Sequence, residues 1–208
     1  NPIKIGIGKV KANGGKIIGV NPIRSGYNAV ADEWVGITPG TDGLFILALI
    51  HELMKAGKVD LNYLTRYTNA PFLVNEDAKS PEHGLFLRDE NGKELVLDRA
   101  TGKPVPFDTP GIKADMAGSY RLAGHTHRPV FQLLADKYMS DEFAPDAIAD
   151  QCGIPVEQIK RIAAELAHVA FEEEITIEQP WTDWKGEKHE RMIGRPVSFH
   201  SMRGLSAH

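Results

Sequence analysis

The sequence predicts an α/β fold: a parallel, dinucleotide-binding-like sheet with helices on both faces and an inserted β-hairpin. Three observations predict it. Short β-branched runs at residues 16–20 and 34–37 each lead into a polar turn, as buried parallel strands do. Apolar residues recur at helical spacing, most clearly over residues 155–170. An Asn-Gly pair lies between two apolar-rich runs within residues 84–98, which is a strong hairpin signal.

The first elements form a nucleotide-site layout. A helix is predicted over residues 2–13, because Asn1 is a good N-cap and Pro2 suits the first helical position. Strand 16–20 follows, and the polar stretch before strand 34–37 has room for about two helical turns. Ligands of α/β sheets bind outside the carboxyl ends of the strands. The turns that follow these two strands are therefore the predicted site.

Further elements follow from apolar spacing, capping residues and turn residues. After Thr41 and Asp42 comes a helix that is apolar almost all round, and such a helix is buried on most sides. The remaining predictions are a short helix capped by Asp60, helices at 129–138, 146–151 and 155–170, a strand at 175–177, a loop at 181–184, and a strand at 197–200 parallel to the first two.

We expect one α/β cofactor-binding domain over residues 1–208, with residues 76–117 as a surface insertion that contains the hairpin. The chain opens at Asn1 without a methionine and closes just after a strand-like run. This predicts an internal piece of a longer protein, too incomplete to be active alone or to hold a whole cofactor tightly.

Composition excludes some classes of function. The 208 residues are 42% hydrophobic and 25% charged, with a net charge of -4 and no basic stripe, so we expect no nucleic-acid binding. The apolar run 44–50 is far short of the roughly 20 residues that a membrane span needs. We therefore expect no membrane contact by these residues. The compartment is left open between bacterial cytoplasm and periplasm.

Two motifs carry a family resemblance. Asn21-Pro22-Ile23-Arg24 follows the first strand, and Ala-Asp-Glu-Trp then leads to Pro-Gly-Thr-Asp-Gly at 39–43. This pattern resembles the molybdopterin oxidoreductases of the dimethyl sulfoxide reductase family, which hold molybdenum between two molybdopterin guanine dinucleotides. The resemblance covers nearly the whole chain, most strongly residues 1–75 and 128–208. In its overall sequence character, the chain most resembles members that act on polysulfide, thiosulfate or sulfite.

The resemblance implies a molybdenum-dependent oxidoreductase acting on an inorganic sulfur compound or another small oxyanion. It implies a bis(molybdopterin guanine dinucleotide) cofactor, with an iron–sulfur cluster and the molybdenum ligand elsewhere in the parent protein. It also implies two partners, an iron–sulfur electron-transfer subunit together with a membrane anchor subunit. No catalytic residue is assigned within the chain. Cys152 is the only cysteine and is interpreted as a small buried side chain.

Asp42 is the sharpest binding candidate. A carboxylate can accept two parallel hydrogen bonds from the N1–H and the amine of guanine, and adenine lacks that pair of donors. The resemblance implies that Gly40-Thr41-Asp42 contacts the guanosine end of the cofactor, as the same motif does in the family. Alternatively, Thr41 or Asp42 only caps the following helix.

The turn Asn21-Pro22-Ile23-Arg24 is the second candidate. Pro22 stiffens it, Asn21 tolerates unusual backbone angles, and Arg24 can reach a phosphate or ribose as a fork of donors. The alternative is a plain turn with a solvated arginine. The family often has aspartate at the position of Asn21. Resemblance adds Asn1, at the end of the loop before the first helix.

The C-terminal segment 202–208 resembles a family turn that approaches the cofactor through its backbone. Arg203 and Gly204 are the candidates there, although Arg203 stands where methionine is usual and Ala207 where glutamine is usual. The histidines 125, 127, 189, 200 and 208 show no metal-ligand spacing, so they are interpreted as structural.

Two other functions stay open. One is a non-catalytic relative of the family, of the respiratory-complex type. The other is an unrelated nucleotide-binding module.

Overall fold

The computed structural model describes residues 2–183 and 186–201. The chain divides into two compact units, the first made of Asn1–Lys58 with Asp141–His208 and the second of Val59–Ser140. Both units mix helices with small sheets, so the α/β class is confirmed in its coarse form. No helix in the described part of the chain is both long and apolar enough to span a membrane.

The first unit begins with helix α1 (Pro2–Ala12), and strands β1 (Ile18–Val20) and β2 (Glu33–Val35) follow. The two strands are parallel, with Val20 opposite Val35. The predicted helix and the predicted parallel pairing are therefore confirmed. The stretch between the strands, which has room for helical turns, forms bends and turns instead, and Gly26 within it has a left-handed conformation (φ +60°).

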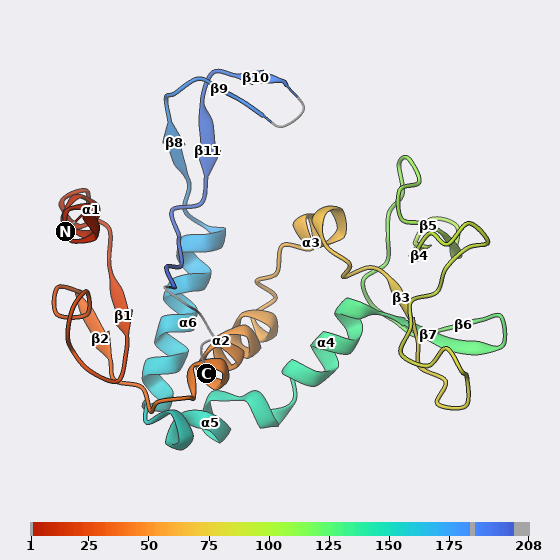
Figure 1. Ribbon diagram of the computed structural model, residues 1–208, viewed down its shortest axis with the longest axis horizontal. Helices are drawn as coiled ribbons and strands as arrows, with labels where there is room; N and C mark the ends of the chain where they lie inside the picture. Colours follow the sequence, from red (N-terminus) through yellow and green to blue (C-terminus); the bar gives the residue numbers. More distant parts are fainter. Residues whose placement is uncertain (1, 184–185, 202–208) are drawn as a thin grey trace. The chain divides into compact units, whose positions relative to one another are not determined.

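Three helices form the core of this unit: α2 (Asp42–Lys55), α5 (Pro145–Cys152) and α6 (Val156–Phe171). They pack against one another, with a short 3-10 helix η1 (Asp141–Phe143) beside α5 (Figure 1). Their buried apolar faces meet Val35 and Ile37 of the segment that leaves β2. The apolar character predicted for α2 is explained by this packing, since Phe45, Ala48 and Leu49 are all buried.

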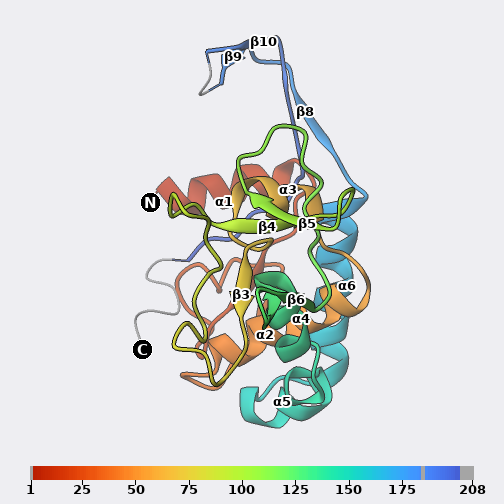
Figure 2. The same ribbon diagram turned by 90° about the vertical axis from the view of Figure 1, so that its right-hand side faces the viewer.

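A hairpin arm, residues 175–183 and 186–194, continues from the C-terminal end of α6 (Figures 1 and 2). Its strands are β8 (Ile175–Ile177), β9 (Trp181–Thr182), β10 (Lys188–His189) and β11 (Met192–Gly194), all paired antiparallel. Trp181 thus lies in a strand and not in the predicted loop.

The predicted third parallel strand, residues 197–200, is wrong. These residues form no strand, and β8 pairs with β11, so within the described residues the parallel sheet has only two strands. Pro196 explains part of the difference, because it has no N–H to donate to a ladder. A dinucleotide-binding-like sheet with helices on both faces is thus not observed.

The second unit is antiparallel. It contains helices α3 (Leu61–Tyr67) and α4 (Val130–Tyr138), and the strands β3 (Leu73–Asn75), β4 (Leu95–Asp98), β5 (Lys103–Pro106), β6 (Tyr120–Leu122) and β7 (His125–Pro129). One sheet has the order β3-β7-β6 and the other pairs β4 with β5. Asp60 caps α3 as predicted, because its carboxylate accepts from the Tyr63 N–H at 2.8 Å.

The hairpin at 84–98 is only partly confirmed. Asp89 and Lys93 close the predicted turn, and Arg88 pairs with Glu94. The main partner of β4 is β5, however, and Val96 and Leu97 are buried, so this segment is not the surface excursion that the sequence predicted. The apolar side chains of β4 instead belong to the core of a unit that spans Val59–Ser140.

Candidate functional site

The two predicted turns meet at one edge of the β1–β2 pair. Because Val20 lies opposite Val35 in parallel register, both strands end on the same side. The Asn21 N–H donates to the Val35 carbonyl at 3.1 Å and extends the pairing into the turn. The candidate site is therefore this edge, lined by residues 21–24 after β1 and 38–42 after β2.

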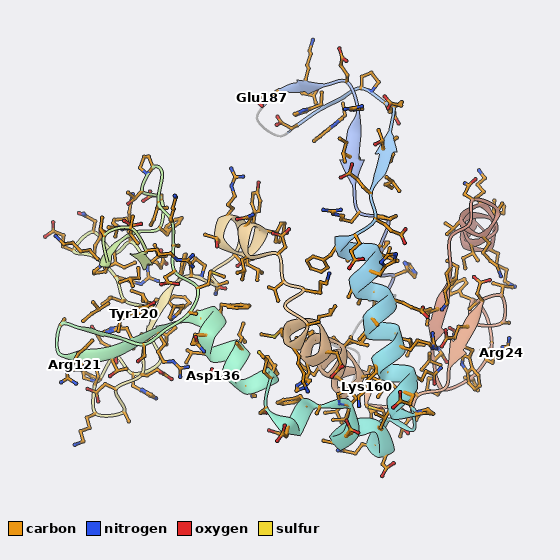
Figure 3. The ribbon with its side chains drawn as sticks, turned by 180° about the vertical axis from the view of Figure 1, so that it is seen from behind. Arg24, Tyr120, Arg121, Asp136, Lys160 and Glu187 are labelled. Atoms are coloured by element: carbon orange, nitrogen blue, oxygen red, sulfur yellow. The ribbon has the colours of Figure 1, made fainter. Side chains whose placement is uncertain are left out.

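Asn21 shapes the first turn through its side chain. Its Oδ1 accepts from the Ile23 N–H at 3.0 Å, which closes a turn that an aspartate could close equally well. Asparagine in place of the aspartate frequent in the family is thus compatible with the same backbone. Pro22, Ile23 and Arg24 are exposed, and Arg24 lies on the side of the strand pair away from α6 (Figure 3).

Hydrogen bonds to α5 and within the loop hold the second turn. The Thr38 N–H donates to the Cys152 carbonyl at 2.8 Å, and both the N–H and the hydroxyl of Thr41 donate to the Thr38 carbonyl. Gly40 has φ +84° and open space where a Cβ would stand. Cys152 is fully buried beneath this turn, as the sequence predicted, and burial raises the pKa of its thiol.

Asp42 is the first residue of α2 and is half-buried. Thr41 occupies the N-cap position, but its side chain makes no capping hydrogen bond. The capping interpretation therefore fails for Thr41. Asp42 places a negative charge in the first turn of a 14-residue helix, where the helix dipole favours it.

A network of charged side chains joins β2 to α6, and the sequence analysis did not predict it. Glu33 of β2 pairs with Arg161 of α6 and with Lys16 at 3.2 Å, and the Gln158 amide donates to the same carboxylate at 2.9 Å. Glu165 joins both cations, at 2.6 Å from each. These contacts, led by Arg161, hold the pKa of Glu33 at about 2. The network fixes β2 to α6, and no local pattern could have predicted it.

Asn1, Arg203 and Gly204 lie outside the described residues. Their predicted role stays a prediction.

The described histidines 125, 127 and 189 make hydrogen bonds to groups of their own unit. His125 Nδ1 lies 2.8 Å from Asp77, and His127 is buried, which lowers its pKa. In the hairpin arm, ligand atoms of Asp183, Glu187 and His189 lie within 4.8 Å of one another. The hairpin's own bonds account for this grouping, since Asp183 accepts from both the Glu187 N–H and the His189 ring. Exposed acidic groups are common in such turns, so we assign it no site.

Comparison with known proteins gives the chain its relatives. No protein-family model matches it. It is 42% identical over its whole length to one chain of the sulfite dehydrogenase of Allochromatium vinosum. Over 76% of the chain it is 30% identical to a putative dimethyl sulfoxide reductase catalytic chain of Halobacterium salinarum. Over 77% it is 26% identical to the alpha chain of the perchlorate reductase of Dechloromonas aromatica.

The matched part is 22%, 19% and 21% of these three relatives, so the chain spans about a fifth of their length. The resemblance seen in the two turn motifs is thus matched by similarity along the whole sequence. The chain belongs to the dimethyl sulfoxide reductase family of molybdopterin oxidoreductases.

Proposed function

We propose that this chain binds the guanosine end of a molybdopterin guanine dinucleotide in a molybdenum-dependent oxidoreductase. One observation carries the proposal: Asn21-Arg24 and Gly40-Asp42 follow parallel strands that end at the same edge. Ligands of α/β sheets bind at such an edge. Family membership adds a molybdopterin cofactor for the whole protein.

The side chains at this edge fit such a group chemically. Arg24 is exposed and can donate to a phosphate or a ribose hydroxyl. The Asp42 carboxylate is the acceptor that a guanine N1–H and amine require. Gly40 leaves open space beside it, so a ligand can approach the backbone closely. When bound, the molybdenum cofactor supplies the redox chemistry, and the residues of this chain hold and orient its nucleotide.

Several finer assignments belong to this proposal and rest on the resemblance. Asn1, Arg203 and Gly204 would add contacts to the cofactor. In the full-length protein β1 and β2 would be part of a larger dinucleotide-binding sheet, with residues 76–117 outside it, and a second dinucleotide and an iron–sulfur cluster would lie beyond this chain.

The proposed substrate is an inorganic sulfur compound or another small oxyanion. Support comes from the names of two relatives, a sulfite dehydrogenase and a perchlorate reductase. Both names denote one component of a multi-subunit assembly, so we propose partner subunits for electron transfer and for membrane anchoring. The relatives are named as dehydrogenases and reductases, which favours an oxidoreductase over a non-catalytic relative or an unrelated nucleotide-binding module.

Two substitutions of Asp42 in the full-length protein test the proposal. Asp42→Ala removes the acceptor of a buried guanine amine and should weaken cofactor binding by about 1–3 kcal/mol. Asp42→Asn should weaken it nearly as much, because the amide presents a donor to the guanine N–H groups. The measurement is guanine released by acid hydrolysis, per polypeptide, alongside the melting temperature.

A matched control is Asp60→Ala, which removes a carboxylate that does cap a helix. It should cost about 1 kcal/mol of stability and leave the guanine content unchanged. If Asp42 acts only through its charge in the first turn of α2, both Asp42 variants will lose a few tenths to 1 kcal/mol of stability and keep their guanine. Full guanine loading of Asp42→Asn would remove Asp42 from the site.

A further inference from the structure

We propose that Trp34 is a positioning residue of this site, because its indole bonds the backbone of the first turn and lies against Gly36, which leads into the second. The inference rests on the proposed function and extends it to a residue that would touch no part of the ligand. Trp34 is the middle residue of β2 and lies opposite Gly19 of β1, one position before both strands end.

The indole N–H reaches the first turn. Trp34 Nε1 donates to the Asn21 carbonyl at 2.9 Å, in a partly buried position. Asn21 is held at its N–H as well, by the Val35 carbonyl at 3.1 Å. Its side chain in turn accepts from the Ile23 N–H at 3.0 Å. Three backbone groups of the turn that carries Arg24 are therefore fixed: the Asn21 N–H, the Asn21 carbonyl and the Ile23 N–H. The second of these bonds depends on the Trp34 side chain, which belongs to the other strand.

The indole ring lies against Gly36, two residues before the second turn. A Cβ placed on Gly36 would stand 3.0 Å and 3.1 Å from two carbons of the Trp34 ring. A side chain at 36 would make a tight contact, so the ring or the backbone would have to shift by a few tenths of an ångström. Gly36 leads through Ile37 into Thr38, whose N–H is fixed to Cys152. One side chain thus holds the backbone of the first turn and packs on the segment that leads into the second.

The hydrogen bond to Asn21 and the ring contact with Gly36 together require tryptophan. The ring supplies the flat surface over Gly36, and the indole nitrogen is a donor only, suited to a backbone carbonyl. Phenylalanine keeps a ring and loses the donor. The Asn21 carbonyl would then be released, and Arg24 would no longer be held in register with Asp42.

The test compares Trp34→Phe with Trp181→Phe in the full-length protein. Trp181 is a matched control, because its indole also donates to a backbone carbonyl, that of Arg191 at 3.0 Å, but in the hairpin arm. Loss of one net hydrogen bond corresponds to about a fivefold change in an equilibrium constant. We expect the guanine retained per polypeptide, after equal dilution and washing, to fall about fivefold in Trp34→Phe and to be unchanged in Trp181→Phe.

A stability control separates positioning from mere folding. Ile37→Ala removes a buried side chain next to the same turn and touches neither Asn21 nor Trp34 by hydrogen bonding. A positioning role requires that Trp34→Phe lose more guanine than Ile37→Ala, although Ile37→Ala has the lower melting temperature. Equal guanine loss in step with melting temperature would overturn the inference. If Trp34→Phe fails to accumulate, Gly36→Ala displaces the ring instead, and unchanged guanine in that variant would overturn it equally.

The outcome for Asp42→Asn distinguishes the two proposals. Guanine lost in Asp42→Asn but kept in Trp34→Phe leaves the proposed function standing and refutes the role of Trp34. Guanine kept in both refutes both.

Discussion

Two strand pairs in the first unit show opposite relations to the core. The parallel pair β1–β2 leads into the buried cluster, where Val35 is 0% and Ile37 is 3% exposed. The antiparallel pair β8–β11 is exposed along its whole first strand, with Ile175 at 42% and Ile177 at 44%. The register places Met192 opposite Ile177, so apolar side chains gather on one face of the arm.

The difference lies in what holds each pair. A parallel pair is normally covered by helices, and here α2, α5 and α6, which all follow β2 in the chain, supply the packing. An isolated two-stranded hairpin is marginally stable in water. Binding sites need side chains held by packed surroundings. The packing behind β1–β2 therefore agrees with the candidate site at its edge, and the arm lacks such packing.

The largest expected difference in the free energy of unfolding is between Ile37→Ala and Ile177→Ala. Removing the buried Ile37 side chain leaves a cavity among α2, α5 and α6 and should lower the free energy of unfolding by about 2–5 kcal/mol. The exposed Ile177 should cost less than about 0.5 kcal/mol. Denaturant unfolding followed by circular dichroism measures both. A cost above about 1 kcal/mol for Ile177→Ala would show that the arm is packed as β2 is.

The next contrast concerns charge and pH. The pKa of Glu33 is lowered from its ordinary 4.5 to about 2, chiefly by the hydrogen bond from Arg161. A lowered pKa stabilises the folded state above pH 4.5, and this contribution is lost as the pH falls from 4.5 toward 2. The full shift would correspond to about 3 kcal/mol. Since Lys16 and Arg161 are 45% and 43% exposed, solvent screening reduces that value.

We therefore expect Glu33→Gln to lower stability by about 1–3 kcal/mol at pH 7, and the difference from the wild type to vanish near pH 2. Unfolding free energies measured between pH 2 and pH 7 test this. Asp146→Asn is the control, because Asp146 also pairs with a cation of α6, Lys160 (labelled in Figure 3), but its side chain is 70% exposed. It should leave the pH dependence nearly unchanged. A constant difference at all pH values would rule out the charge of Glu33 as the cause.

Local chemistry explains what the sequence could predict. The N-cap of α3 and the Asp89–Lys93 turn depend on residues within a few positions of one another. The parallel pairing of β1 and β2 followed from two short β-branched runs with polar turns. The predicted strand 197–200 was wrong because a strand forms only where it has a partner to pair with. The partner of β8 is β11, and nothing in the local sequence indicates that pairing.

In the candidate site too, the locally determined features were predicted and those that depend on distant residues were missed. Its turns were predicted from Asn-Pro-x-Arg and Pro-Gly-Thr-Asp, which shape the backbone locally. Trp34 and Glu33 were missed, although Trp34 stands in the Asp-Glu-Trp motif. Their roles depend on Asn21 and on α6, which meet them only in the folded chain.

The smallest contrast is between two glycines, Gly153 and Gly186. Both have left-handed backbone conformations, with φ +67° and φ +87°. Gly153 ends α5, and a Cβ there would stand 3.0 Å from the Thr38 hydroxyl, beside the Thr38–Cys152 hydrogen bond. A Cβ on Gly186 would meet open space. Gly153→Ala should therefore lower global stability by about 1–2 kcal/mol, through left-handed strain and the displaced turn.

Gly186→Ala carries similar strain in a segment that can open by itself, so its effect should be local. We expect the global unfolding free energy of Gly186→Ala to change by less than about 0.5 kcal/mol. Hydrogen exchange should instead accelerate at the Asp183 amide, which donates to the Glu187 carbonyl across the turn. Gly153→Ala should leave exchange in the arm unchanged. An equal loss of global stability in the two variants would mean that the arm unfolds together with the helical core, and would remove the distinction drawn here between the two strand pairs.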